Sequence, residues 1–251
     1  MPPAIDGTDP RGCTDGENPP ALLGDCRVKD KFAQELAQMA LALHEQPDVE
    51  QTAERFLDYV QSTIGTQHAS VVLLHRGGRL ESAASTDALV EEADRLQVET
   101  GEGPSYAAIH DEESVVCADA ASDARWPAWS AEVAIVGLRS VLSVRLRTPT
   151  TTIGALNLYD KAEQRFTAAD QAIAQVFADH AAVAVANARS ESTLWQAIEA
   201  RKLIGQAQGI LMERFDLTDE QAFAVLRRYS QDTNVKLRDV AQRLIATRKL
   251  S

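Results

Sequence analysis

A helical pattern runs without a break from Thr167 to Phe215, and it limits what the rest of the chain can fold into. The stretch contains no proline, and its only glycines are Gly205 and Gly209. Thr167 and Asp170 have the spacing of a capping box, which marks the start of a helix. These 49 residues would extend roughly 73 Å at about 1.5 Å per residue. A helix of that length is typical of a coiled coil or of a connection between separate domains.

A near-heptad row of side chains follows this predicted helix. Alternating steps of four and three residues keep the row on one face, as in a coiled coil. Its members are Ile173, Phe177, His180, Ala184, Asn187, Glu191, Leu194, Ile198 and Arg201. We expect this signalling helix to pair with its copy in a homodimer. The alternative is a break near residues 189–191, with each half packing inside its own domain.

Charge is distributed unevenly along the chain, whose net charge is −12. Residues 1–191 carry 15 Lys and Arg against 30 Asp and Glu, whereas residues 192–251 carry 10 against 7. A basic segment beside an acidic one indicates a polyanionic partner such as RNA. Because the basic excess is modest, a solvated basic face explains it equally well.

Cysteine use and hydropathy favour a cytoplasmic protein. Cys13, Cys26 and Cys117 are odd in number and lack Cys-x-x-Cys spacing, so neither a disulfide framework nor a structural zinc site is expected. No apolar run reaches the roughly 18 residues of a membrane span, and the N-terminus has no signal-peptide pattern. Residues 1–27 are rich in Pro, Gly and Asp, and they predict a disordered tail.

The segment before the long helix alternates between helical and β-branched patterns. Helices are predicted from Lys29, after the N-cap Asp48, over 87–98, over 105–110 and at the Trp126-Pro127 pair. Strands are predicted over residues 68–74, 80–85, 114–117, 140–147 and 151–159. Antiparallel hairpins bracketed by helices give an α+β domain with one central antiparallel sheet flanked by helices.

The C-terminal sixty residues predict an all-α three-helix bundle. The long helix ends near Phe215, and Thr218 with Gln221 forms a second capping box. Asn234 suits the left-handed conformation that ends a helix, and Lys236 begins the last helix. The inward-facing residues are expected to be Ala222, Phe223, Leu226, Tyr229, Leu237, Val240, Ala241 and Leu244.

A cluster of cations and amides is expected at the turn between the last two helices. Lys236 and Arg238 lie in the first turn of the final helix, where cations oppose the helix dipole, so an external anion explains them better than helix stability does. The same corner holds Arg228, Ser230, Gln231 and Asn234. Charged donors suit phosphates, and amides and hydroxyls suit the edges of unstacked RNA bases.

Residues 204–244 resemble the ANTAR domain, an RNA-binding module of transcription antiterminators. The resemblance rests on IGQAQGILMER, AFAVLRRYSQDTN and KLRDVA. It implies binding to hairpins in nascent transcripts and transcription antitermination. It also adds Gln208, Gly209 and Arg214 of the first helix to the candidate RNA-binding residues, and it leaves Met212 in the core. The family usually has Lys where Gln208 stands, which weakens a phosphate contact there.

Residues 48–189 resemble a GAF domain, through GEGPSYAAI, DARWPAW, GLRSVLSVRL and GALNLYDKAEQRF. This resemblance implies a six-stranded antiparallel sheet and a sensor role. GAF domains often sense small molecules, although many have no known ligand, and the residues name neither a ligand nor a cofactor. The expected organisation is a tail (1–27), a GAF-like sensor (28–189) and an ANTAR-like RNA-binding domain (190–251), with the linking helix over about 167–215.

Several residues were weighed for other chemistry and set aside. His68, His75 and His110 lack metal-ligand spacing, and Cys117 has no resolving partner. Ser105, followed by Tyr106, has no nearby base that would make it a nucleophile. The cyclic-nucleotide signature of some GAF domains is matched only loosely, by Asn157, Lys161, Phe166 and Asp170. Trp126 and Trp129 are expected to pack in the core or to line a pocket.

No catalytic constellation is visible, so an enzyme is not expected. The main alternative function is a protein-interaction module whose basic corner meets an acidic partner.

Overall fold

The computed structural model describes residues 21–249, with side chains from residue 32 onward. The chain divides within helix α1 (Ala21–His44) into two units, residues 1–38 and residues 39–251. Helix α1 begins with Ala-Leu-Leu, residues of high helix propensity, so residues 21–27 of the expected disordered tail are helical. The remainder of that tail lies outside the described residues.

The sensor part of the chain has the alternating helices and strands that the sequence predicted. Its elements are α2 (Val49–Ile64), β1 (His68–Leu74), β2 (Leu80–Ser85), α3 (Ala88–Thr100), α4 (Pro104–His110), β3 (Ser114–Cys117), α5 (Pro127–Val136), β4 (Ser140–Arg147) and β5 (Thr152–Asp160). The Asp48 carboxylate caps α2 by accepting a 2.8 Å hydrogen bond from the Gln51 N–H. The Asp87 carboxylate caps α3 in the same way. Local capping therefore fixes where these two helices begin.

The strands form one antiparallel sheet in the order β2-β1-β5-β4-β3. It has five strands, so the sixth strand implied by the GAF resemblance is wrong for the described residues. After β3, the carboxylates of Asp119 and Asp123 accept hydrogen bonds from backbone N–H groups two residues on, which folds this segment into turns.

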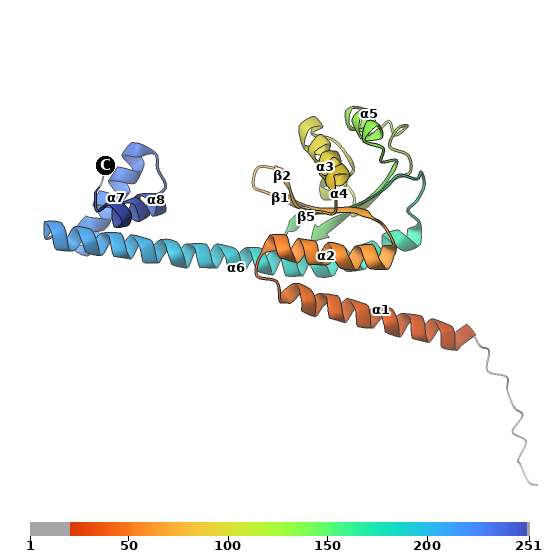
Figure 1. Cartoon of the computed structure of the whole chain (residues 1–251), viewed down its shortest axis with the longest axis horizontal. Helices are drawn as coiled ribbons and strands as arrows, with labels where there is room; N and C mark the ends of the chain where they lie inside the picture. Colours follow the sequence, from red (N-terminus) through yellow and green to blue (C-terminus); the bar gives the residue numbers. More distant parts are fainter. Residues whose placement is uncertain (1–20, 250–251) are drawn as a thin grey trace, which may run out of the picture. The chain divides into compact units, whose positions relative to one another are not determined.

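Helices cover both faces of the sheet. Helix α2 and the first part of α6 (Ala168–Phe215) lie on one face, and α3, α4 and α5 lie on the other (Figure 1). Along β5, Leu156 and Leu158 alternate with Asn157 and Tyr159. Because all four are buried, the sheet is the middle layer of an α+β domain.

Helix α6 is one uninterrupted helix of 48 residues. The capping box at Thr167 and Asp170 is present, with both reciprocal hydrogen bonds formed. The alternative of a break near residues 189–191 is therefore wrong for this structure. Within residues 21–249, no helix is long and apolar enough to cross a membrane.

The end of α6 forms a three-helix domain with α7 (Asp219–Thr233) and α8 (Leu237–Thr247) (Figure 1). The second capping box, Thr218 with Gln221, is present. The fully buried core residues are Ala207, Leu211, Ala222, Leu226, Val240, Ala241 and Leu244, with Met212, Tyr229 and Leu237 packed against them. Phe223 was expected to face inward, but 37% of its surface is exposed, because it lies one residue away from the buried Ala222 on the helix face.

Candidate nucleic-acid interface

The turn between α7 and α8 is held by its own backbone and one hydroxyl. Asn234 has the left-handed conformation (φ 52°, ψ 33°), and its N–H donates to the Gln231 carbonyl. The Ser230 hydroxyl donates a 2.6 Å hydrogen bond to the Val235 carbonyl. Ser230 is thus a positioning residue of the turn, while Gln231 and Asn234 are exposed.

Three cations surround this turn in different states. Lys236 is exposed and has no hydrogen bond or ion pair among the residues whose side chains are described. Arg228 is 85% exposed and lies 3.6 Å from the Asp232 carboxylate, a surface pair of little energetic weight. Arg238 lies 3.3 Å from the carboxylate of its neighbour Asp239.

These positions correct part of the argument from helix polarity. Helix α8 begins at Leu237, so Lys236 is the N-cap residue and not a first-turn residue. Asp239, in that first turn, offsets the helix dipole and neutralises Arg238. The inference of an external anion therefore rests on Lys236, which no acid of the described chain compensates.

The candidates on the first helix are not at this corner. The Gln208 amide donates a 2.7 Å hydrogen bond to the Asp219 carboxylate, which ties α6 to the first turn of α7. The Arg214 guanidinium donates a 2.6 Å hydrogen bond to the Arg248 carbonyl at the end of α8. A Cβ on Gly209 would meet nothing within 4 Å, so no neighbouring helix of this domain requires glycine there.

A second basic site lies at the opposite end of α8. Phe215 and Leu244 line a groove of about 270 Å³ that is bordered by Arg214, Arg248 and Lys249. The 11 residues of α8 separate this groove from the turn by roughly 16 Å. Arg248 and Lys249 were missed in the sequence, where their position at the end of a helix is explained by the dipole alone.

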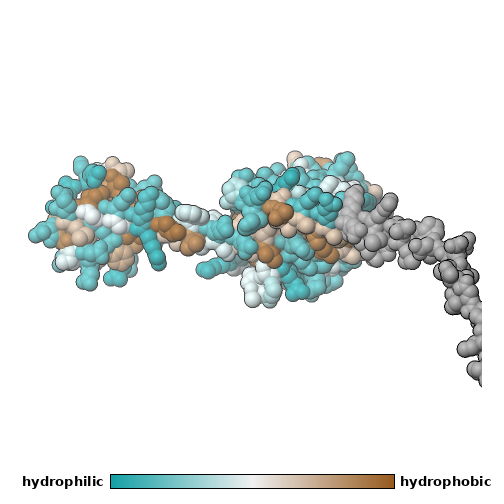
Figure 2. All heavy atoms as spheres, turned by 90° about the horizontal axis from the view of Figure 1, so that it is seen from below, coloured by the Kyte–Doolittle hydropathy of each residue, from teal (hydrophilic) through white to brown (hydrophobic). Residues whose placement is uncertain are grey.

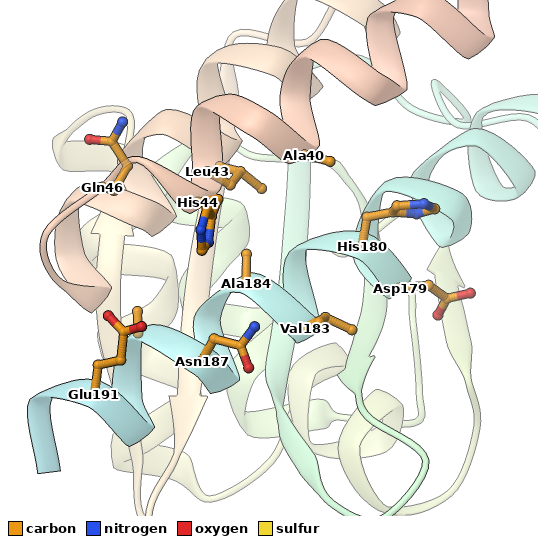
Figure 3. Close-up of a pocket in the computed structure, with 11 residues that line it drawn as sticks. Ala40, Leu43, His44, Gln46, Asp179, His180, Val183, Ala184, Asn187 and Glu191 are labelled. Carbon is orange, nitrogen blue, oxygen red and sulfur yellow. The ribbon is translucent and has the colours of Figure 1, made fainter. Parts of the chain in front are cut away.

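The heptad row divides into a buried and an open part. Phe177 is fully buried in the sensor core and Ile173 is half-buried, so neither is open to a partner helix. The next members line a groove of about 450 Å³ between α6 and the C-terminal end of α1, and Figure 3 shows the His44 ring directed toward Ala184. These members are His180, Ala184, Asn187 and Glu191.

Beyond the groove, α6 carries large apolar side chains in solvent. Leu194 is 61% exposed, Trp195 69% and Ile198 46%. Figure 2 shows hydrophobic side chains on this segment of α6. Exposed apolar residues gathered on one segment mark an interaction surface.

Comparison with known families assigns both parts of the chain. The model of the GAF domain matches residues 46–186, more than half of the chain, and the model of the ANTAR domain matches residues 192–245. The chain belongs to the GAF–ANTAR proteins. A search of curated proteins finds no match.

Solved structures resemble the fold of the GAF–ANTAR chain over its GAF domain. The GAF domain of a phosphoenolpyruvate-protein phosphotransferase from Acinetobacter is 16% identical, with a TM-score of 0.53, covering 65% of this chain and 98% of that one. Its counterpart from Coxiella burnetii is 18% identical (TM-score 0.52; 64% and 96% covered). Free methionine-R-sulfoxide reductase from Neisseria meningitidis, solved with its substrate, is 17% identical (TM-score 0.52; 64% and 91% covered). At these identities the likeness concerns the fold alone.

The GAF domain contains a buried polar cluster between its sheet and α3. The Asp94 Oδ1 atom accepts hydrogen bonds from Tyr159 (2.8 Å) and Asn157 (3.1 Å). Asn157 in turn accepts from the hydroxyls of Ser105 and Ser143. Among the described residues, the Asp94 Oδ2 atom is the one buried side-chain polar atom without a hydrogen-bond partner.

Burial raises the pKa of Asp94 to about 6, against the opposing effect of hydrogen bonds from Ser70, Tyr159, Asn157 and Ser82. The GAF domain therefore keeps a carboxyl in its core that titrates close to neutral pH. Such a group is unusual in a core that is otherwise well paired.

The residues set aside for other chemistry have structural roles. Asn157 belongs to the polar cluster, Phe166 is buried, Asp170 caps α6 and Lys161 is exposed, so these four do not meet as a nucleotide site. Within the described residues no group of three His, Cys, Asp or Glu is placed to hold a metal ion.

The remaining candidates also pack in the GAF core. Trp129 is fully buried and donates from its ring N–H to the Ala93 carbonyl, and Trp126 packs edge-on against it. Cys117 is buried, and burial with its hydrogen bond to Asp123 raises its pKa to about 12. A thiol in that environment is not a nucleophile.

Proposed function

We propose that this GAF–ANTAR protein is a cytoplasmic regulator that binds hairpins in nascent RNA and favours antitermination. Its ANTAR domain, over residues 190–251, binds the RNA, and its GAF domain, over residues 28–189, senses and does not catalyse. The observation that carries the proposal is the α7–α8 corner of the ANTAR domain. There the uncompensated cation Lys236 stands beside exposed amide groups.

The corner suits an RNA loop better than a duplex. Lys236 and Arg228 supply phosphate contacts, and Gln231 and Asn234 offer both donors and acceptors to the edges of unstacked bases. The left-handed Asn234 presents these side chains on a tight turn. Because surface pairs such as Arg228 with Asp232 contribute little, the arginine can exchange its carboxylate for a phosphate.

We further propose that the protein acts as a homodimer paired along α6. The groove beside His180, Ala184, Asn187 and Glu191 and the exposed apolar side chains at Leu194 and Ile198 continue one heptad row. A partner helix on this row would bury apolar surface that now faces water. Two ANTAR domains held together would bind a tandem hairpin by avidity.

The continuous α6 supplies the connection between the two domains. Its first part packs on α2 and β4 of the GAF domain, and its last part packs on α7 and α8. A change in how the GAF domain holds α6 would thus reach the RNA-binding pair through one rigid element.

The test replaces the two cations at the start of α8. Lys236→Ala combined with Arg238→Ala should weaken binding to RNA hairpins selected from a library with randomised loops. The slope of log affinity against log salt should fall by about 1.4, at about 0.7 per lost phosphate contact. Gel-shift titrations at several salt concentrations measure both quantities.

The control removes the same charge elsewhere. Arg55→Ala combined with Lys161→Ala takes two exposed cations from the GAF domain, and hairpin affinity should stay within two-fold. Unchanged affinity in the α8 double variant, with an unchanged helical circular dichroism spectrum, would show that the corner is not the RNA face. If no hairpin is enriched from the library while an acidic protein binds the corner, the protein-interaction alternative holds.

A further inference from the structure

A basic groove lies where α6 leaves the sheet of the GAF domain. Its walls are the β1–β2 turn, the β4–β5 turn and the α6 segment around Arg189, and its volume is about 660 Å³. The polar side chains used below are His75, Arg76, Arg189, Thr150, Thr151 and Thr152. This groove is distinct from the one beside α1 and from the buried polar cluster around Asp94.

The groove contains cations and hydroxyls, and no carboxylate lines it. That composition is unusual for a part of the chain in which residues 1–191 carry twice as many acids as bases. The nearest acid, Glu81, is held from outside the groove by His75 (3.3 Å) and Arg79 (2.7 Å). The positive potential of the lining is therefore not neutralised from within.

The two guanidinium groups have donors to spare. Arg189 donates from Nη1 to the Leu74 carbonyl (3.2 Å), and its Nη2 lies 3.4 Å from the Nδ1 atom of His75. A guanidinium has five N–H donors, so more than half of its donors remain. Arg76 is exposed and has no hydrogen bond or ion pair among the residues whose side chains are described.

The opposite wall is a preformed turn of hydroxyl residues. The Thr148 hydroxyl accepts a hydrogen bond from the Thr151 N–H (3.1 Å) and donates to the Thr151 carbonyl (3.2 Å), which closes the turn. The hydroxyls of Thr150, Thr151 and Thr152 are then free to point at a ligand. A rigid turn carries a smaller entropy cost on binding than a flexible loop.

We propose that this groove binds a small phosphate-bearing molecule. Planar guanidinium groups match the geometry of phosphate oxygens, and threonine hydroxyls add neutral donors. The volume lies within the range of small-molecule sites and exceeds what one inorganic phosphate fills. The phosphate group lies between Arg76, Arg189 and the threonine turn.

Such a ligand would join both hairpin turns to the linking helix, because Arg189 belongs to α6. Binding would add contacts between the sheet and α6 that the free protein lacks. Control of RNA binding by this ligand rests on the function proposed above, whereas the binding site itself does not.

The experiment titrates the full chain with pyrophosphate and with citrate, by calorimetry and by amide chemical shifts. Pyrophosphate should bind at one site and shift the amides of residues 75–76 and 150–152, and citrate should bind at least ten-fold more weakly. Arg76→Gln should weaken pyrophosphate at least ten-fold, a change of about 1.4 kcal/mol, and Arg76→Lys should recover part of it. Arg76 makes no contact that folding needs, so this variant keeps the fold.

Arg79→Gln is the matched control, since it removes a charge from the same hairpin outside the groove. It should leave pyrophosphate affinity within two-fold. Equal losses in Arg76→Gln and Arg79→Gln, equal binding of citrate and pyrophosphate, or shifts confined to the ANTAR domain would each overturn the proposal. Hairpin affinity of Arg76→Gln without pyrophosphate should equal that of the unaltered protein, so failure here is separable from failure of RNA binding.

Discussion

Replacing Asp94 by Asn should stabilise the GAF domain at neutral pH. Asp94 is buried, and its Oδ2 atom has no hydrogen-bond partner. Asparagine has the same shape, and its Oδ1 atom can accept the hydrogen bonds from Asn157 and Tyr159 that Asp94 accepts now. The substitution therefore removes a buried charge and keeps the cluster.

The magnitude follows from the pKa of Asp94. Burial raises this pKa from 3.8 to about 6, which corresponds to about 3 kcal/mol. Below pH 3.8 the carboxyl is protonated in the folded and unfolded states, and the stability due to the raised pKa is fully present. As the pH rises through about 6, the folded protein has to ionise the buried group, and this stability is lost. The loss is about 1 kcal/mol at pH 4.5 and about 3 kcal/mol at pH 7.5.

The assay is urea unfolding followed by tryptophan fluorescence. Trp126 and Trp129 are buried in the GAF domain, whereas Trp195 is exposed and changes little on unfolding. The difference in unfolding free energy between Asp94→Asn and the unaltered protein should grow by about 2 kcal/mol between pH 4.5 and pH 7.5. Other acids, such as Asp123, titrate alike in both proteins and cancel. A difference that stays constant with pH would refute the reasoning, because Asp94 would then not titrate in the core.

Three further perturbations address the ANTAR core, the dimer and the sheet. Leu226→Ala empties a fully buried position and should cost about 2–5 kcal/mol, so helical circular dichroism should fall while fluorescence-detected unfolding of the GAF domain is retained. Leu194→Asp with Ile198→Asp places charges on the exposed part of the heptad row and should give a monomer in sedimentation equilibrium; a persistent dimer would contradict pairing along α6. Gly154→Ala places a methyl group onto the backbone oxygen of Val72, and it should lower the unfolding free energy of the GAF domain by about 1–3 kcal/mol.

The sequence predicted the candidate site only in part. The exposed corner with Lys236, Arg228, Gln231 and Asn234 forms as expected, because a capped helix end and a short turn bring these residues together locally. Arg214 lies at the other end of α8, where it binds the carbonyl of a residue 34 positions away. No spacing in the sequence reveals such a partner.

Local signals determined the secondary structure of this protein. The capping boxes, the left-handed Asn234 and the absence of proline from α6 act within a few residues, so the sequence alone sets where these helices begin and end.

Tertiary packing decided which side chains remain available. It buried Phe177 and so took the first part of the heptad row out of reach, it left Phe223 exposed, and it used the Gln208 amide to bind Asp219. The reason is that a side chain's partners depend on how whole helices pack, and residues far apart in sequence meet only after the core has formed.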